Sequence, residues 1–160
     1  MDKALFLDRD GVLNIDKGYV YKREDFQFVP GVFEVLQEAQ KLGYVLIVVT
    51  NQSGIARGLY TEDDYQSLNA WMLREFEQAG VSIRHVYHCP FHVDGVVAEL
   101  TLDSNMRKPN PGMLLLAQEE HGLDMKMSIM VGDKESDIEA GKGAEVGTTV
   151  RVASRLDTQS

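Results

Sequence analysis

Residues able to do chemistry fall in four groups along this chain of 160 residues. Carboxylates can act as nucleophiles, as acids and bases, or as ligands of hard metal ions. An Asp-x-Asp pair alone is commonly turn chemistry, but four polar groups placed at the ends of apolar stretches together indicate a functional site. The groups are Asp8 with Asp10, Thr50 with Asn51, Arg107 with Lys108, and Asp133 with Asp137.

Five short apolar runs predict the strands that must position these groups. A continuous apolar run bounded by turn residues is typical of a buried strand in a parallel sheet. In open α/β sheets ligands bind at the carboxyl ends of the strands, which is where the first, second and fourth runs lead into polar residues. The expected strands cover residues 4–7, 44–49, 83–87, 127–131 and 148–152.

Helices are expected between these strands. Strands that alternate with helices predict an α/β fold in which three layers are built around a central, mostly parallel sheet. No linker or internal repeat divides the sequence, so we expect a single domain over residues 1–160 with no large cap domain. The expected helices follow Pro30-Gly31 up to Gly43, run from Thr61 to Gly80, start at Asn110-Pro111 and end before Gly122, and cover residues 135–142.

Two segments lack a clear period. Residues 14–28 are expected to form a flap beside the end of the first strand, with short extended pieces at Val20-Tyr21 and at 26–28. Residues 90–106 contain the mixed run 96–100, which we interpret as loop or a weak extended piece.

Charge and cysteine content exclude several classes of protein. The formal net charge of -9 opposes attraction to nucleic acid or to an anionic membrane surface. An anionic substrate must therefore be attracted by a local cationic patch or by a metal ion. Cys89 is the single cysteine, which excludes an internal disulfide and favours a reducing compartment, and no signal-peptide pattern is present. We expect a cytoplasmic protein.

Four motifs resemble those of the haloacid dehalogenase superfamily of phosphatases, in the same order along the chain. Within the superfamily, the chain is most similar to the branch of histidinol-phosphate phosphatases and heptose bisphosphate phosphatases. The similarity extends from about Leu5 to Val152. The motifs are Asp8-Arg9-Asp10-Gly11-Val12, Val49-Thr50-Asn51-Gln52-Ser53-Gly54, Arg107-Lys108-Pro109, and Val131-Gly132-Asp133-Lys134 with Asp137.

The resemblance implies a Mg²⁺-dependent phosphatase that works through an aspartyl-phosphate. Asp8 is then the nucleophile, and Asp10 protonates the leaving group and later deprotonates the attacking water. Asp8, the backbone carbonyl of Asp10, and Asp133 are the implied ligands of Mg²⁺. Asp137 is expected to orient the metal ligands without binding the metal itself.

The resemblance also implies residues that hold the substrate. Thr50 and the backbone N–H of Asn51 would hydrogen-bond the phosphoryl oxygens, and Lys108 would stabilise their charge in the transition state. Arg107 can offer two parallel hydrogen bonds to a second anionic group of the substrate. The remaining expected substrate contacts are Asp16, Gly18, Tyr19, Gln52, Ser53 and Lys134.

A zinc site in the 88–106 loop is the main alternative reading of the chain's cysteine and histidines. Heptose bisphosphatases commonly carry a zinc loop here, but in this chain Ser104 and Met106 stand at the later cysteine positions and Phe91 at the histidine position. Stable structural zinc sites usually need four ligands, which His88, Cys89 and His92 do not supply. No zinc is expected.

The first hypothesis for the substrate is a small phosphorylated metabolite, with D-glycero-D-manno-heptose 1,7-bisphosphate, cleaved at its 7-phosphate, first among them. Histidinol phosphate is the alternative within the branch. A nucleic acid 3′-phosphatase and a phosphate-binding module without catalysis are further alternatives. The net charge argues against a nucleic acid 3′-phosphatase. The presence of all the expected catalytic residues argues against a phosphate-binding module without catalysis. We expect a monomer with no nucleic acid or membrane partner.

Overall fold

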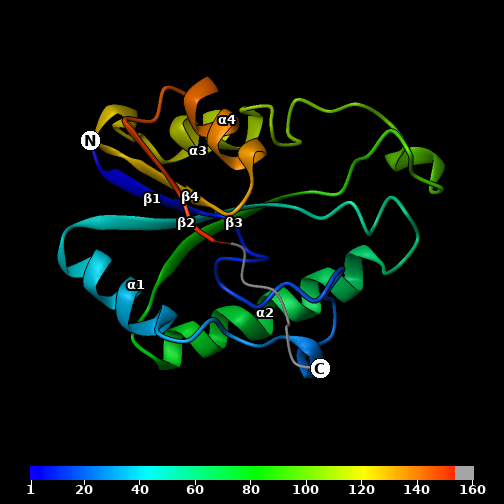
Figure 1. Cartoon of the computed structure of the whole chain (residues 1–160), viewed down its shortest axis with the longest axis horizontal. Coiled ribbons are helices and arrows are strands. Elements are labelled where there is room, and N and C mark those ends of the chain that lie inside the picture. The colour runs from blue at the N-terminus through cyan, green and yellow to red at the C-terminus, as the bar shows by residue number, and fades with distance from the viewer. Residues whose placement is uncertain (154–160) are drawn as a thin grey trace.

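The computed structural model describes residues 1–153, and its five strands form one parallel sheet (Figure 1). The strand order is β3-β2-β1-β4-β5, so β1 is central and the order reverses between β1 and β4. Such a reversal leaves a crevice at the carboxyl ends of the two central strands. The strands are β1 (Lys3–Leu7), β2 (Tyr44–Asn51), β3 (Ile83–Cys89), β4 (Ile129–Gly132) and β5 (Thr148–Arg151).

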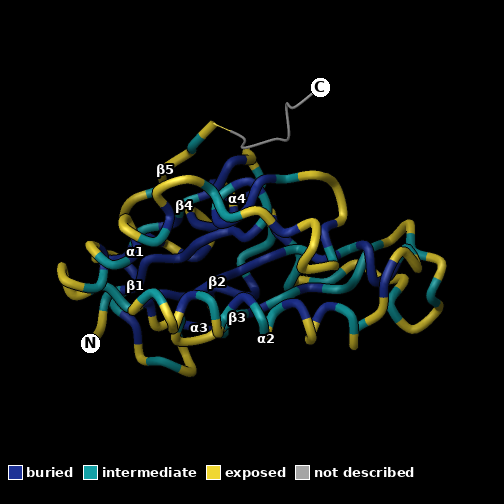
Figure 2. Tube along the Cα trace, turned by 90° about the horizontal axis from the view of Figure 1, so that it is seen from below, coloured by how far each residue is buried: buried dark blue, intermediate teal, exposed yellow. Residues whose placement is uncertain are grey.

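Helices cover both faces of the sheet, with α1 and α2 below it and α3 and α4 above it in Figure 1. Side chains alternate along β1, so Ala4 and Phe6 pack with α3 and α4, whereas Leu5 and Leu7 pack with α1 and α2. Figure 2, which views the molecule from below, shows the central strands buried and the exposed residues mainly in the turns and loops around them. The predicted three-layer α/β fold is therefore confirmed. The helices are α1 (Val32–Lys41), α2 (Glu62–Gln78), α3 (Gly112–His121) and α4 (Glu135–Gly143).

The start of α2 was predicted correctly, since Thr61 and Asp64 form a capping box. The Thr61 hydroxyl accepts a hydrogen bond from the Asp64 N–H at 3.1 Å, and the Asp64 carboxylate accepts one from the Thr61 N–H at 2.9 Å. None of the helices described in residues 1–153 has the length and apolar content needed to cross a membrane.

The expected extended pieces at 20–21 and 26–28 flank a 3₁₀ turn at Arg23–Asp25, and Phe28 forms an isolated bridge with Asn14. The 96–100 segment is loop with a second 3₁₀ turn at Ala98–Leu100. One strand boundary was wrong. The fourth strand begins at Ile129 and not at Met127, because Met125–Met127 forms a 3₁₀ turn whose last N–H is bonded by the Asp124 side chain.

Asn110 does not cap α3. The helix begins at Gly112, and the Asn110 side chain instead donates a hydrogen bond to the Ser104 carbonyl at 3.1 Å. The contact fastens the loop before α3 to residue 104. A side chain that can cap a helix has here found a tertiary partner.

Candidate active site

The carboxyl ends of β1, β2 and β4 bring the predicted groups together at one edge of the sheet. Asp8 directly follows β1, and its N–H still pairs with the Val131 carbonyl of β4 at 3.1 Å. Thr50 lies near the end of β2, and Asp133 directly follows β4. Parallel strands end on the same side, so their register accounts for the convergence.

Lys108 joins this edge from the loop before α3 and lies between two buried carboxylates. Its ammonium donates to Asp8 at 2.8 Å, to Asp137 at 2.6 Å and to the Val49 carbonyl at 2.9 Å. Only 3% of Lys108 and 1% of Asp137 are exposed. Burial disfavours the charged form, but the two carboxylates outweigh it and raise the pKa of Lys108, which stays a cation.

Negative charge exceeds positive charge at this place. Carboxylate oxygens of Asp8, Asp133 and Asp137 lie within 4.8 Å of one another, opposite the single ammonium of Lys108. Burial raises the pKa of Asp8 to about 7, although Lys108 opposes the rise. A hard divalent cation fits such a set of oxygen donors and would offset its charge.

Asp8 and Asp133 are better placed than Asp137 to hold a cation. Asp137 uses one oxygen on Lys108 and accepts the Lys134 N–H with the other at 3.1 Å. This pattern fits a residue that holds neighbouring groups in place.

Two glycines allow these carboxylates to approach so closely. Gly11 has φ +92°, and a Cβ on it would lie 2.2 Å from an Asp133 carboxylate oxygen. A Cβ on Gly132 would lie 2.2 Å from the Cβ of Asp137. Both positions lie in the motifs recognised in the sequence, but their role in making room for Asp133 and Asp137 was not foreseen.

Asp10 lies outside the carboxylate cluster and is held by its own partners. Arg9 donates to both Asp10 oxygens at 3.0 and 3.2 Å, and Asn14 donates to Oδ1 at 3.0 Å. Gln52 donates to Oδ2 at 3.2 Å. Arg9 is 1% exposed and also donates to the Val20 carbonyl at 2.9 Å, so it attaches the flap to the site. Sequence reasoning gave no role to Arg9 or Asn14.

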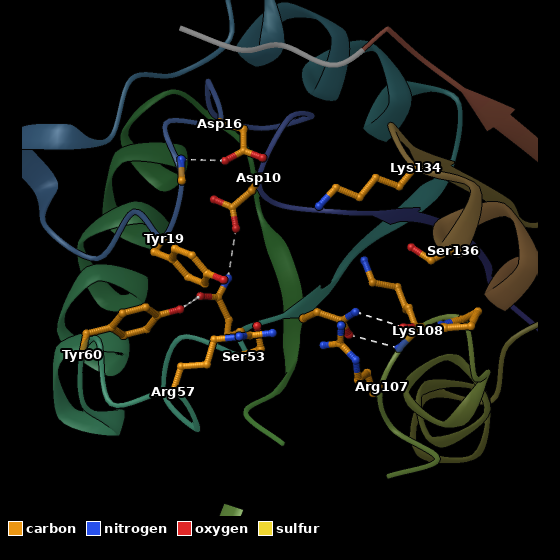
Figure 3. A pocket seen from close by; sticks show the side chains of 14 residues that line it. Asp10, Asp16, Tyr19, Ser53, Arg57, Tyr60, Arg107, Lys108, Lys134 and Ser136 are labelled. Atoms are coloured by element: carbon orange, nitrogen blue, oxygen red, sulfur yellow. Dashed lines mark hydrogen bonds between the residues drawn. The ribbon is translucent and has the colours of Figure 1, made fainter. Parts of the chain in front are cut away.

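A pocket of about 500 Å³ opens above this edge (Figure 3). It contains every predicted substrate-binding residue, and Asp10 and Lys108 reach its wall. Arginine and lysine side chains surround much of it, although the whole chain is acidic. Sequence reasoning did not expect four of its residues to line a pocket, although Pro109 stands in a recognised motif. The pocket is lined by Asp10, Asp16, Gly18, Tyr19, Asn51, Gln52, Ser53, Arg107, Lys108 and Lys134, and by the missed Arg57, Tyr60, Pro109 and Ser136.

The side chain of Asn51 connects β2 to the Lys108 loop. Its amide accepts from the Lys108 N–H at 3.0 Å and donates to the Lys108 carbonyl at 3.1 Å. This reciprocal pair positions the Lys108 backbone.

The 90–106 loop packs beside the pocket. Its Val96 and Val97 N–H groups donate to the Ala56 carbonyl at 2.7 and 3.0 Å. Cys89 is fully buried, and its pKa is raised by that burial while a hydrogen bond with Ser104 opposes the rise. The loop is thus attached to the pocket rim and to the core by contacts of its own residues.

Comparison with known proteins agrees with this site. The HAD-hydrolase-like family model matches residues 105–154. The chain is 51% identical to D-glycero-alpha-D-manno-heptose-1,7-bisphosphate 7-phosphatase of Burkholderia mallei, over 96% of this chain and 82% of that protein. It is 49% identical to D-glycero-beta-D-manno-heptose-1,7-bisphosphate 7-phosphatase of Yersinia pestis, over 93% and 79%.

A solved structure gives the same answer. The D,D-heptose 1,7-bisphosphate phosphatase of B. bronchiseptica, complexed with magnesium and phosphate, superposes with a TM-score of 0.78 at 29% identity, covering 89% of this chain and 76% of that one. The fold and the site are those of a phosphatase of the haloacid dehalogenase superfamily, a class of phosphoric monoester hydrolases. The chain belongs to its family of D-glycero-D-manno-heptose-1,7-bisphosphate 7-phosphatases.

The raised pKa of Asp8 predicts how the stability of the metal-free protein changes with pH. The unfolded chain loses this proton near pH 3.8, whereas the folded protein keeps it to about pH 7, so folding stability from Asp8 falls as pH rises between these values. Relative to an Asp8→Asn variant in EDTA, the wild type should lose stability on the order of a few kcal/mol from about pH 4 to about pH 7. Urea unfolding of both proteins measures the difference, and a difference independent of pH would contradict it.

Proposed function

We propose that the protein is a Mg²⁺-dependent phosphatase that removes the 7-phosphate from D-glycero-D-manno-heptose 1,7-bisphosphate through an aspartyl-phosphate on Asp8. The observation that carries the proposal is the buried Asp8, paired with Lys108 at 2.8 Å, below a pocket with cationic walls. The names of the relatives support the choice of substrate.

In the proposed reaction an Asp8 oxygen attacks phosphorus, and the bond from phosphorus to the sugar oxygen breaks. Asp10 supplies the proton that the leaving alkoxide needs. Water then attacks the phosphoryl group of the aspartyl-phosphate and gives a proton to Asp10, so inorganic phosphate leaves and Asp8 is regenerated. Arg9 and Asn14 hold the Asp10 carboxyl group in one position for both steps, in which it gives a proton as the acid and takes one as the carboxylate.

The charge of the transferring phosphoryl group needs compensation at this site. Lys108, the Thr50 hydroxyl and the Asn51 N–H are the groups proposed to contact its oxygens. Asp8, Asp133 and the backbone carbonyl of Asp10 would hold Mg²⁺. When bound, Mg²⁺ offsets the repulsion between the carboxylate and the phosphate and stabilises the developing charge.

The second phosphate of the substrate has a cationic wall to bind. Arg107 and Arg57 both line the pocket, and the Arg107 Nη1 atom is buried with no hydrogen-bond partner among residues 1–153. An unsatisfied buried guanidinium N–H is suited to donate a hydrogen bond to a phosphate oxygen. Asp16, Gly18, Tyr19, Ser53 and Lys134 are proposed to contact the sugar and its phosphates from the rest of the wall.

We also propose that the protein needs no zinc and acts as a cytoplasmic monomer. Cys89 hydrogen-bonds Ser104, and the loop is attached through the Ala56 carbonyl, which supports a loop ordered by its own contacts. The acidic net charge of -9 argues against nucleic acid and anionic membranes as partners.

A substrate panel tests the proposed function. Heptose 1,7-bisphosphate in both anomers should give the highest kcat/KM, ahead of histidinol phosphate and of nucleic acid 3′-phosphates, because only the bisphosphate uses the cationic wall. EDTA should abolish phosphate release, and Mg²⁺ without added zinc should restore it. No release from any phosphomonoester with Mg²⁺, or a requirement for zinc, would contradict the proposal.

The space at Gly11 tests the metal site separately from turnover. Gly11→Ala should weaken Mg²⁺ binding by at least about tenfold, because the new methyl group displaces Asp133. Gly31→Ala is the matched control, since Gly31 has a similar φ of +84° but no atom within 4 Å of the added Cβ. Calorimetric titration of the folded proteins with Mg²⁺ measures both. Equal dissociation constants in the two variants would show that Asp133 is not a ligand.

A further inference from the structure

The side-chain amide of Gln52 is fully used inside the protein. Gln52 is 2% exposed, and its Nε2 donates to Thr50 Oγ1 at 2.9 Å and to Asp10 Oδ2 at 3.2 Å. Its Oε1 accepts a hydrogen bond from the Tyr60 hydroxyl. An amide nitrogen has two hydrogens, so Gln52 has no donor left for a substrate, although it lines the pocket.

Tyr60 determines which way this amide faces. A half-turn of the amide would place the acceptor Oε1 against the Asp10 carboxylate. An ionised carboxylate has no hydrogen to donate, so the two oxygens could not form a hydrogen bond. Burial raises the pKa of Tyr60, so its hydroxyl keeps its proton and donates to Oε1. With that donor in place, Nε2 must face Thr50 and Asp10.

The Tyr60 ring is itself held in place. It stacks on Tyr21 with ring centroids 5.2 Å apart and an interplanar angle of 9°. On another side it packs over Gly54, where a Cβ would lie 2.1 Å from Tyr60 Cε1. Figure 3 shows Tyr60 at the pocket wall with its hydroxyl directed toward the Gln52 amide.

The arrangement sets the direction of the Thr50 hydroxyl. Because Thr50 Oγ1 accepts the Gln52 hydrogen, its own hydrogen is available for donation. Its acceptor among the described residues is the Asn51 carbonyl at 3.4 Å, which is long for a hydroxyl donor. A phosphoryl oxygen would be a much stronger acceptor.

We propose that Tyr60 and Gln52 are positioning residues for phosphoryl transfer. The Tyr60 hydroxyl holds the Gln52 amide, and the amide in turn directs the Thr50 hydroxyl toward the phosphoryl group and holds one oxygen of Asp10. Gln52 then acts through Thr50 and Asp10 and not as a substrate contact, which differs from the expectation drawn from the resemblance. The inference rests on the proposed roles of Thr50 and Asp10.

A double-mutant cycle tests the inference with the best substrate of the panel and Mg²⁺. Tyr60→Phe should lower kcat by about tenfold while KM changes by less than about twofold, because the residues it positions act in the chemical step. Gln52→Met should lower kcat at least as far. The kcat of the double variant should equal that of Gln52→Met, because Tyr60 affects the reaction only through Gln52.

The matched control is Tyr21→Phe, which removes a neighbouring hydroxyl that forms no hydrogen bond among residues 1–153 and should leave kcat and KM unchanged. A rise in KM with unchanged kcat in Tyr60→Phe would show that its hydroxyl binds substrate. Losses that multiply in the double variant would show that the two residues act independently. Either result overturns the inference.

Thermal melting of Gln52→Met and the activity of the wild type separate a folding defect and a wrong proposed function from a wrong positioning role. If Gln52→Met does not fold, as judged by thermal melting, the split between kcat and KM in Tyr60→Phe still decides. An inactive wild type would refute the proposed function, whereas an active wild type with independent losses would refute only the positioning role.

Discussion

The ion pairs of Lys108 with Asp8 and Asp137 are the interaction on which the site depends. Three segments meet there: the end of β1, the loop before α3 and the first turn of α4. Removing charges from water costs several kcal/mol per ion, and a buried pair offsets this only with short, well-satisfied contacts. The ammonium has three hydrogens and three acceptors here, the third being the Val49 carbonyl. These three contacts hold the Lys108 ammonium in place, and a phosphoryl oxygen would contact it by replacing one of these acceptors.

The same cluster explains why a cation belongs in the site. One ammonium cannot balance Asp8, Asp133 and Asp137, and the pKa of Asp8 is raised mainly by burial, with a smaller contribution from the Asp137 carboxylate. A phosphorylated substrate would add more negative charge at the same place. Positive charge from a bound metal ion and from the pocket wall would thus serve both the folded protein and the proposed reaction, in a chain whose net charge is -9.

Sequence patterns predicted the framework better than the contacts. Apolar runs located all five strands, because burial on both faces leaves a continuous pattern, and the polar residues after β1 and β4 indicated the edge where the site lies. The predicted start of β4 at Met127 and the predicted start of α3 at Asn110-Pro111 were wrong, because the side chains of Asp124 and Asn110 form hydrogen bonds that the local sequence pattern does not specify.

The supporting residues of the site could not be read from the sequence for a related reason. Arg9 stands inside a recognised motif, but its bonds to Asp10 and to the Val20 carbonyl depend on how the flap folds back. Tyr60 reaches Gln52 only because the intervening loop returns over Gly54. Such contacts join residues whose separation and type carry no periodic signal.

The central claim is that Asp8 itself receives the phosphoryl group. Acid quenching of the enzyme during turnover, reduction of the acyl phosphate with borohydride and peptide mapping by mass spectrometry test it directly. The account predicts modification at Asp8 that requires both substrate and Mg²⁺. Modification at Asp10, or phosphate release with no acyl phosphate detected at Asp8, would contradict it.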